Sequence, residues 1–197
     1  MNRVITSVLR LLRGLRRPSK AASARRLHAR GETPASLVIR DATAADIPAL
    51  ARLHVQTFRE THGGGPSADL REQQYRQKFA ASDGRWFCLV AARANGDLVG
   101  FIVGQPADPP DEGGHVNKIY VLRSYQRLGL GRRLLADASR RFVSHGYTSM
   151  TLFSQADNPS IWFFDAMGGE RLLGASGEFG GGYRWSDLRD LADRPSI

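Results

Sequence analysis

Two glycines in the segment QRLGLG, residues 126–131, are placed where they are able to bind an anion. A strand-like run, HVNKIYVL, precedes the segment, and apolar residues recur after it at helical spacing. Gly129 and Gly131 therefore occupy a turn into a helix, where free backbone N–H groups and the helix dipole attract anions. Glycine also lets a phosphate approach without a Cβ in the way. Because glycine is common at such turns for conformational reasons, a purely structural role stays open.

The spacing of these residues separates the candidate ligands. The segment lacks the G-x-G-x-x-G and G-K-[ST] patterns, which argues against NAD and ATP. It matches [RQ]-x-x-G-x-[GA], with Gln126, Gly129 and Gly131 at the defined positions. With this motif the sequence resembles the Gcn5-related N-acetyltransferase (GNAT) family. Three further segments extend the resemblance from about residue 37 to the end: LVIRDATAADIPALARLHVQTFRETHGG, GRWFCLVAARANGDLVGFIVG and DNPSIWFFDAMGGERL.

The resemblance implies acetyl-CoA as co-substrate and assigns residues to it. The turn would wrap the pyrophosphate with N–H groups from residues 127–132, and its arginines either add charge or form a solvated helix face. Extended backbone at residues 119–121 would bind the pantetheine arm, and one N–H would polarise the thioester carbonyl. Asn158 would contact the arm or merely cap a helix. The expected cofactor-binding residues are Ile119, Tyr120, Val121, Arg127, Leu128, Gly129, Leu130, Gly131, Arg132 and Asn158.

Acyl transfer to an amine also needs a group that accepts the amine proton. His115 lies eleven residues before Gln126, a spacing at which members of the resembled family carry a glutamate or histidine base. Histidine, with an unperturbed pKa near 6.5, suits that role near neutrality. Glu112, in the preceding acidic loop, is the rival base. A histidine at the end of a strand is also commonly a surface residue without a catalytic role.

Phe164 departs from the family pattern. The pattern N-x-x-x-x-F-[YF], starting at Asn158, ends where many family members carry a tyrosine that protonates the departing thiolate. Phenylalanine has no proton to give. Tyr120 or Tyr183 replaces it, water does, or the thiolate leaves unprotonated. The run WFF at residues 162–164 is otherwise typical of core packing.

The elements that must position these residues alternate between helices and strands. A T-x-x-D capping box at residues 43–46 opens a helix to about residue 60, and a second helix covers about 68–81. ANGD marks a hairpin at residues 94–97, TSMTLFS a strand, PSIWFFDAM a short helix and GEFGGGYRWSDL a final strand. This order predicts an α/β fold, a mixed sheet covered by helices. The resemblance implies a GNAT-like acyl-CoA N-acyltransferase fold, splayed after residue 154 to admit the pantetheine arm.

Composition limits the class of protein further. The 197 residues suffice for one domain with a substantial core. A single cysteine, Cys88, rules out an intrachain disulfide framework and favours a reducing compartment such as the cytoplasm. Cys88 lies in an apolar run, WFCLVAA, as expected of a buried hydrophobe and not of a nucleophile. No Cys or His cluster has zinc spacing, so no metal is predicted.

The charge of +9 is concentrated at the N-terminus. Residues 1–36 carry nine Lys or Arg and one acidic residue, a net of +8, which leaves +1 for the rest and gives no reason to expect nucleic-acid binding. Residues 1–17 form a basic amphipathic pattern too short to span a bilayer. The pattern suits a membrane surface, an acidic partner, a mitochondrial presequence in a eukaryote, or a disordered tail. Pro18 and the Ser/Ala/Arg stretch after it indicate a linker, so residues 1–36 are expected as leader and 37–197 as the N-acetyltransferase domain.

These features predict an acetyl-CoA-dependent N-acetyltransferase that acts on a primary amine of a small molecule or protein. Cys88 is a poor covalent nucleophile, which favours direct transfer in a ternary complex. The acidic loop with Asp108, Asp111 and Glu112 hints at a cationic acceptor, although a solvated turn has the same composition. The alternative is a catalytically weak acyl-CoA-binding module, docked to a membrane or partner by its basic leader, and Phe164 keeps that alternative open.

Overall fold

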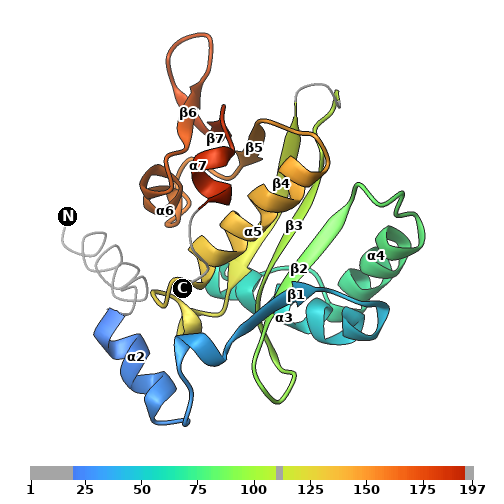
Figure 1. Cartoon of the computed structure of the whole chain (residues 1–197), viewed down its shortest axis with the longest axis vertical. Helices are drawn as coiled ribbons and strands as arrows, with labels where there is room; N and C mark the ends of the chain where they lie inside the picture. Colours follow the sequence, from blue (N-terminus) through green and yellow to red (C-terminus); the bar gives the residue numbers. More distant parts are fainter. Residues whose placement is uncertain (1–19, 110–112, 194–197) are drawn as a thin grey trace, which may run out of the picture.

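The computed structural model describes residues 20–109 and 113–193, and within them a mixed sheet forms the centre of the molecule (Figure 1). The strand order is β1-β2-β3-β4-β5-β7-β6. Strands β4 and β5 run parallel, and the other neighbours run antiparallel. The predicted mixed α/β architecture is confirmed. The strands are β1 (Val38–Asp41), β2 (Phe87–Ala92), β3 (Leu98–Pro106), β4 (Gly114–Val121), β5 (Met150–Phe153), β6 (Glu170–Leu173) and β7 (Phe179–Trp185).

Helices cover both faces of the sheet (Figure 1). α5 packs on one face, and α3 and α4 pack on the other, so that each face contributes to its own hydrophobic cluster. No helix in the described ranges is long and apolar enough to cross a membrane. The α-helices are α2 (Lys20–His28), α3 (Ile47–His62), α4 (Ala68–Ala80), α5 (Leu130–Ser144), α6 (Ile161–Ala166) and α7 (Arg189–Ala192), with 3-10 turns η1 (Pro34–Ser36), η2 (Ala44–Asp46) and η4 (Arg123–Tyr125).

Helix α3 begins where the capping box predicts. The Thr43 backbone N–H donates to Asp46 Oδ2 at 2.7 Å, within the 3-10 turn that leads into the helix. The helix ends at His62, and the left-handed backbone of Gly63, φ +80°, closes its C-terminus. A local sequence signal at each end therefore fixes this element.

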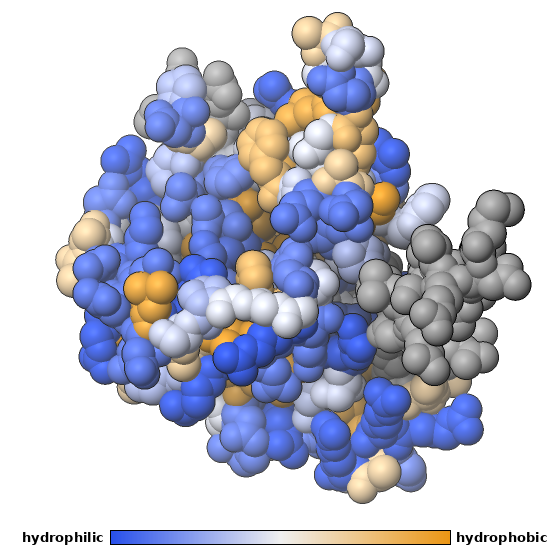
Figure 2. All heavy atoms as spheres, turned by 180° about the vertical axis from the view of Figure 1, so that it is seen from behind, coloured by the Kyte–Doolittle hydropathy of each residue, from blue (hydrophilic) through white to orange (hydrophobic). Residues whose placement is uncertain are grey.

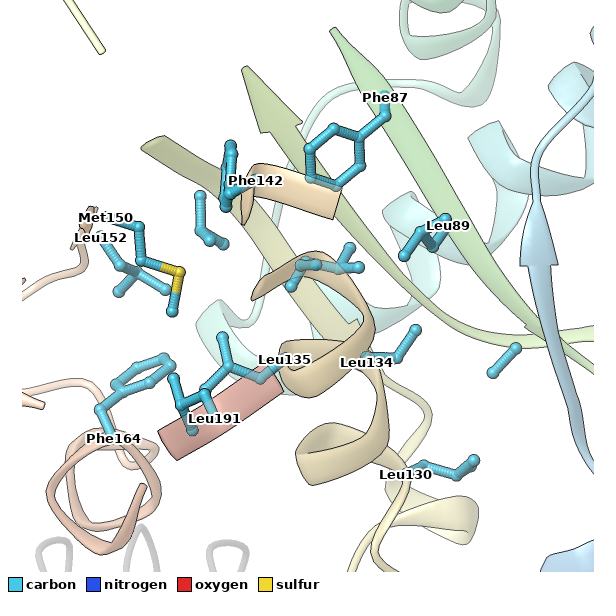
Figure 3. Close-up of a cluster of buried hydrophobic side chains, with 14 of the residues drawn as sticks. Phe87, Leu89, Leu130, Leu134, Leu135, Phe142, Met150, Leu152, Phe164 and Leu191 are labelled. Atoms are coloured by element: carbon cyan, nitrogen blue, oxygen red, sulfur yellow. The ribbon is translucent and has the colours of Figure 1, made fainter. Parts of the chain in front are cut away.

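Helix α5 supplies much of the core beneath the sheet. Its apolar stripe, predicted from helical spacing, lies against β2, β3 and β4, in one cluster with Met150 and Leu152 of β5 (Figure 3). The Phe142 ring meets the Phe87 ring edge to face with 5.0 Å between centroids. The stripe fixes the rotation of α5 and hence the direction of its first turn.

Strands β4 and β5 separate partway along the sheet. Their pairing runs from Gly114 opposite Met150 to Val116 opposite Leu152, and β4 then continues to Val121 paired only with β3. The expected opening is therefore present, and it begins slightly before residue 154. A shift in the β3–β4 register, from Val116 opposite Gly104 to Lys118 opposite Val103, falls at the same point. The second half of β4 has its β5-facing edge free.

The linker interpretation is wrong for residues 20–36. Helix α2 lies within this stretch, and Leu27, only 1% exposed, belongs to the core cluster beneath α5. Arg30 Nη1 donates to the Tyr125 hydroxyl at 3.0 Å, and Glu32 forms an ion pair with Arg93. One leucine is a weak signal in a basic, Ser- and Ala-rich stretch, and composition therefore misled the prediction. The predicted amphipathic segment 1–17 lies outside the described residues, and the boundary between residues 36 and 37 stays a prediction.

The contribution of α2 to the stability of the protein can be measured by substituting Leu27. Leu27→Ala should lower the free energy of unfolding by about 2–5 kcal/mol, because it removes a buried side chain and leaves a cavity. Leu70→Ala, at an exposed leucine of α4, is the matched control and should cost about 0.5 kcal/mol or less. Urea denaturation measures both. A chain lacking residues 1–36 should likewise be less stable than the full-length chain, and equal stability would contradict the role of α2.

Candidate active site

The turn between β4 and α5 presents a row of backbone N–H groups. Arg127 and Gly129 both have left-handed backbone, with φ of +68° and +83°. Gln126 Nε2 donates to Val121 O at 3.0 Å, which fastens the turn to the end of β4. Hydrogen bonding of α5 starts with the Arg133 N–H donating to Gly129 O, and among the described residues no group accepts from the N–H groups of 127–132. Six unpaired donors at a helix N-terminus form a site for an anion.

A cavity of about 430 Å³ lies between this turn, β4 and α6. Ile119 and Val121 supply its wall on the β4 side, and aromatic residues of α6 supply the opposite wall. Arg127 and Arg132 lie at the end formed by the turn. The cavity thus joins an apolar channel along the free edge of β4 to a basic end lined with N–H groups. This shape and charge fit a long ligand with an uncharged arm and a phosphate group.

Six of the ten expected cofactor residues line this cavity: Ile119, Val121, Arg127, Gly129, Gly131 and Arg132. Tyr120 lies on the other face of the sheet, where its ring is 5.5 Å from His54 and 5.6 Å from Phe101. The side chains of Leu128 and Leu130 are buried in the core, which leaves only their backbone for a ligand. The structure therefore brings together the backbone of the turn and the side chains of Ile119 and Val121.

Asn158 lies at the start of the α6 turn. Its Oδ1 accepts a hydrogen bond from the Ser160 N–H at 2.8 Å, and Asn158 does not line the cavity. This bond holds the turn ahead of α6, whose N-cap residue is Ser160, and contact of Asn158 with a cofactor arm stays a prediction.

The two glycines of the turn serve different physical needs. A Cβ on Gly129 would meet no atom within 4 Å, so its φ of +83° is the reason that glycine fits. A Cβ on Gly131 would lie 3.2 Å from Phe163 Cζ, in the gap between the turn and α6. Conformational freedom explains Gly129, and close approach explains Gly131.

The WFF run has two different roles. Phe164 is 4% exposed and packs on Tyr183, with 5.3 Å between ring centroids, as expected of a core residue. Trp162 is 69% exposed and lines the cavity, so the core-packing interpretation is wrong for it. Trp162 and Phe164 lie within one helical turn and differ in exposure, and the uniformly apolar run WFF gave no indication of this difference.

Neither tyrosine considered as a proton source is free of other contacts. The Tyr183 hydroxyl lies within hydrogen-bond distance of Ile161 O, at 3.2 Å, and of Asp165 Oδ1, at 3.0 Å. Burial and the neighbouring carboxylate raise the pKa of Tyr183. Burial likewise raises the pKa of Tyr120, which faces α3. We therefore assign protonation of the leaving thiolate to neither tyrosine.

His115 lies at the start of β4, half-buried, where β4 still pairs with β5. Its Nδ1 is 3.1 Å from Thr151 Oγ1, and its ring centroid is 5.7 Å from that of Phe153. Burial, and then the charge of Lys118, lower the pKa of His115 below its usual 6.5. The imidazole is therefore neutral at pH 7, the form in which it accepts a proton. Glu112, the rival base, lies outside the described residues.

Thr151 was not identified from the sequence. It is the β5 partner of His115 in the parallel pair, and that register comes from tertiary packing and not from any local motif. A strand prediction for residues 148–154 places Thr151 on a strand, but it does not say which residue lies opposite.

Cys88 is buried in β2, and burial raises the pKa of its thiol. The thiol stays protonated at neutral pH and is a poor nucleophile, as the apolar run predicts. Across residues 20–109 and 113–193, no group of three or more His, Cys, Asp or Glu side chains is placed to hold a metal ion.

Comparisons with known proteins agree with this architecture. Residues 47–168 match the acetyltransferase (GNAT) family. The uncharacterised N-acetyltransferase YuaI of Bacillus subtilis (strain 168) is 30% identical over 167 residues, which cover 79% of this chain and 96% of that protein. Among solved structures, the PaiA N-acetyltransferase of Thermoplasma acidophilum in complex with coenzyme A has a TM-score of 0.58 at 20% identity, covering 76% of this chain and 98% of that one.

A second solved structure is similar over nearly the same length. The putative acetyltransferase YncA of Salmonella typhimurium, determined with its cofactor acetyl-CoA, has a TM-score of 0.59 at 20% identity and covers 79% of this chain and 95% of that one. The family match spans the α3 helix, the β4 strand, the glycine-containing turn at residues 126–131 and α6. The chain therefore belongs to the GNAT family of N-acetyltransferases.

Proposed function

We propose that this enzyme transfers the acetyl group of acetyl-CoA to a primary amine by direct attack within a ternary complex. The observation that supports this most is the row of unpaired N–H groups at residues 127–132, at the basic end of an apolar cavity beside the free edge of β4. The structural relatives named above contain coenzyme A or acetyl-CoA. A half-buried histidine on the same strand supplies a base.

The binding part of the proposal uses the backbone first. The N–H groups of residues 127–132 would donate to the pyrophosphate, and Arg127 and Arg132 would add charge. The free β5-facing edge of β4 would bind the pantetheine arm through its backbone, with Ile119 and Val121 packed along it. Both needs of such a ligand, anionic and apolar, are met at opposite ends of one cavity.

The chemical part assigns the proton transfer to His115. When bound, acetyl-CoA supplies a thioester with an electrophilic acetyl carbon. In the reaction the amine nitrogen bonds to that carbon, the carbon–sulfur bond breaks, His115 takes the amine proton and coenzyme A leaves as the thiol or thiolate. Thr151, 3.1 Å from His115 Nδ1, would hold the ring so that Nε2 is the accepting nitrogen. Direct attack is consistent with the protonated, buried thiol of Cys88.

An amine panel tests the proposal. Full-length protein and acetyl-CoA are incubated with small amines and peptide N-termini, and free thiol is measured. We expect thiol release that depends on the amine, and initial-rate lines that intersect as a ternary complex requires. Acetyl-CoA that binds in calorimetry but releases no thiol above background with any amine would favour a binding module. Parallel rate lines would refute direct transfer.

A further inference from the structure

A second cavity lies on the opposite face of the sheet, beneath α3 and α4. Its volume is about 550 Å³, within the range of small-molecule sites. Residues of α4, β3 and β4 line it, including Gln105 and Lys118. Gln105 is the β3 partner of His115, and paired residues of antiparallel strands point to the same face. The cavity therefore lies on the face toward which His115 points, and the strand partner of His115 is part of its lining.

The charged residues that line this cavity are all basic. Arg71 and Lys78, two turns apart on α4, face Lys118 from β4, and no Asp or Glu of residues 20–109 and 113–193 lines the cavity. Among the described residues, none of the three forms an ion pair. Within the part of the chain that the structure describes, three cations thus converge on one space without an anion to balance them.

The hydrogen bonds of these cations are also incomplete. Arg71 Nη1 donates to Gln74 Oε1 at 2.9 Å, but Arg71 Nε is buried and has no partner. Lys118 Nζ donates to Asn117 Oδ1. Burial, followed by the charges of Arg71 and Lys78, lowers the pKa of Lys118. A buried donor without a partner and a set of unbalanced charges are costly unless a ligand satisfies them.

The surface around the cavity agrees with a polar ligand. Figure 2 shows the molecule from this side, and hydrophilic residues cover most of the region over α3 and α4. Inside, Tyr75, Trp86 and His54 provide an aromatic wall. Burial lowers the pKa of His54 to about 3, so this ring is neutral and adds no charge. The site thus combines a basic floor with an apolar side, as a small organic anion requires.

We propose that this cavity binds the acceptor, and that the acceptor is a small amine that also carries an anionic group, either a carboxylate or a phosphate. The inference rests on the proposed function for the identity of the reacting amine. Arg71 and Lys118 would hold the anionic group, Arg71 with its planar guanidinium and Lys118 as a point charge. The same cations would repel a second ammonium and lower the pKa of the acceptor amine, which favours its nucleophilic form. This assignment differs from the cationic acceptor suggested by the acidic loop.

Matched acceptors test the proposal. Amino acids are compared with their carboxamides, and aminoalkyl phosphates with the corresponding amino alcohols, in the thiol-release assay at fixed acetyl-CoA. We expect kcat/KM to be about 10-fold or more higher for the anionic member of each productive pair, a factor that one charge-assisted hydrogen bond supplies. Arg71→Gln and Lys118→Gln should reduce that preference to near unity. Arg76→Gln, on an exposed face of the same helix, removes one charge outside the cavity and should keep it.

Calorimetric titration of the same compounds separates this proposal from the proposed function. Anionic compounds that bind the wild type and not Arg71→Gln, without any turnover, would support the cavity as an anion site while refuting acetyl transfer. Turnover with equal kcat/KM for both members of every pair would refute the anionic acceptor and leave the acetyltransferase proposal intact. Binding and preference unchanged in both Gln variants would overturn the cavity assignment.

Discussion

His115→Ala should lower kcat/KM for amine acetylation by about 100-fold or more, the scale of general base catalysis. Burial and Lys118 lower the pKa of His115, so the wild-type rate should fall only below pH 6.5, where the imidazole becomes protonated. The variant should lose that acidic limb. Acetyl-CoA affinity should stay within about threefold of wild type, because the glycine-containing turn lies at the other end of β4. Steady-state rates from pH 5 to 9 measure each effect.

Two control variants sharpen this result. His28→Ala removes an exposed histidine of α2 and should leave the rate and the pH profile unchanged. Lys118→Gln removes a charge that lowers the pKa of His115, so its acidic limb should move to higher pH. A His115→Ala enzyme with a near-normal rate and the same acidic limb would assign the proton to another group. Glu112→Gln is then the next variant to measure.

The double substitution Gly129→Ala and Gly131→Val should weaken acetyl-CoA binding by about 100-fold or more. The Gly131 Cβ would lie 3.2 Å from Phe163 Cζ, so the valine methyl groups would enter the gap between the turn and α6. Gly129 holds a φ of +83°, and alanine would disfavour the turn that aligns the N–H groups. Loss of two charge-assisted hydrogen bonds, about 1.5–3 kcal/mol each, accounts for this change. Titration calorimetry measures it.

Gly146 provides the matched control. It lies just beyond the other end of α5 with φ +86°, and a Cβ there would also meet no atom within 4 Å. Gly146→Ala therefore imposes a backbone strain similar to that of Gly129→Ala without touching the turn. Its acetyl-CoA affinity should equal that of wild type. If the double variant is folded by circular dichroism and binds acetyl-CoA normally, the turn does not hold the phosphates.

Local signals predicted most of the fold. The Thr43 capping box, the apolar stripe of α5 and the ANGD turn each act within a few residues, and the structure confirms the elements that they predict. Helix α2 was missed because its place depends on contacts far along the chain: it lies against η4, and Arg30 donates to the Tyr125 hydroxyl, 95 residues away. Tertiary burial decided that element, and composition gave no sign of it.

The candidate site was predictable where it consists of backbone. The turn at residues 126–131 has a local motif, and its N–H groups follow from a strand-to-helix connection. Contacts between side chains were harder to predict from the sequence, because the pairing of His115 with Thr151 depends on strand register. The convergence of Arg71 with Lys118 depends on the rotation of α4 against the sheet, and α4 has no clear apolar stripe to reveal that rotation. Contacts between residues on different helices and strands were therefore the ones that could not be predicted from this single sequence.

The opening between β4 and β5 has a consequence for the cohesion of the whole sheet. Three residue pairs, Gly114 to Val116 with Met150 to Leu152, join the β1–β4 half to the β5–β7–β6 half. A ligand in the opening touches β4 on one side and α6, which precedes β6, on the other. The binding free energy of such a ligand therefore also stabilises the association of the two halves of the sheet. If acetyl-CoA binds in this opening as proposed, it would take the place of the missing β4–β5 hydrogen bonds and would hold the two halves of the sheet together.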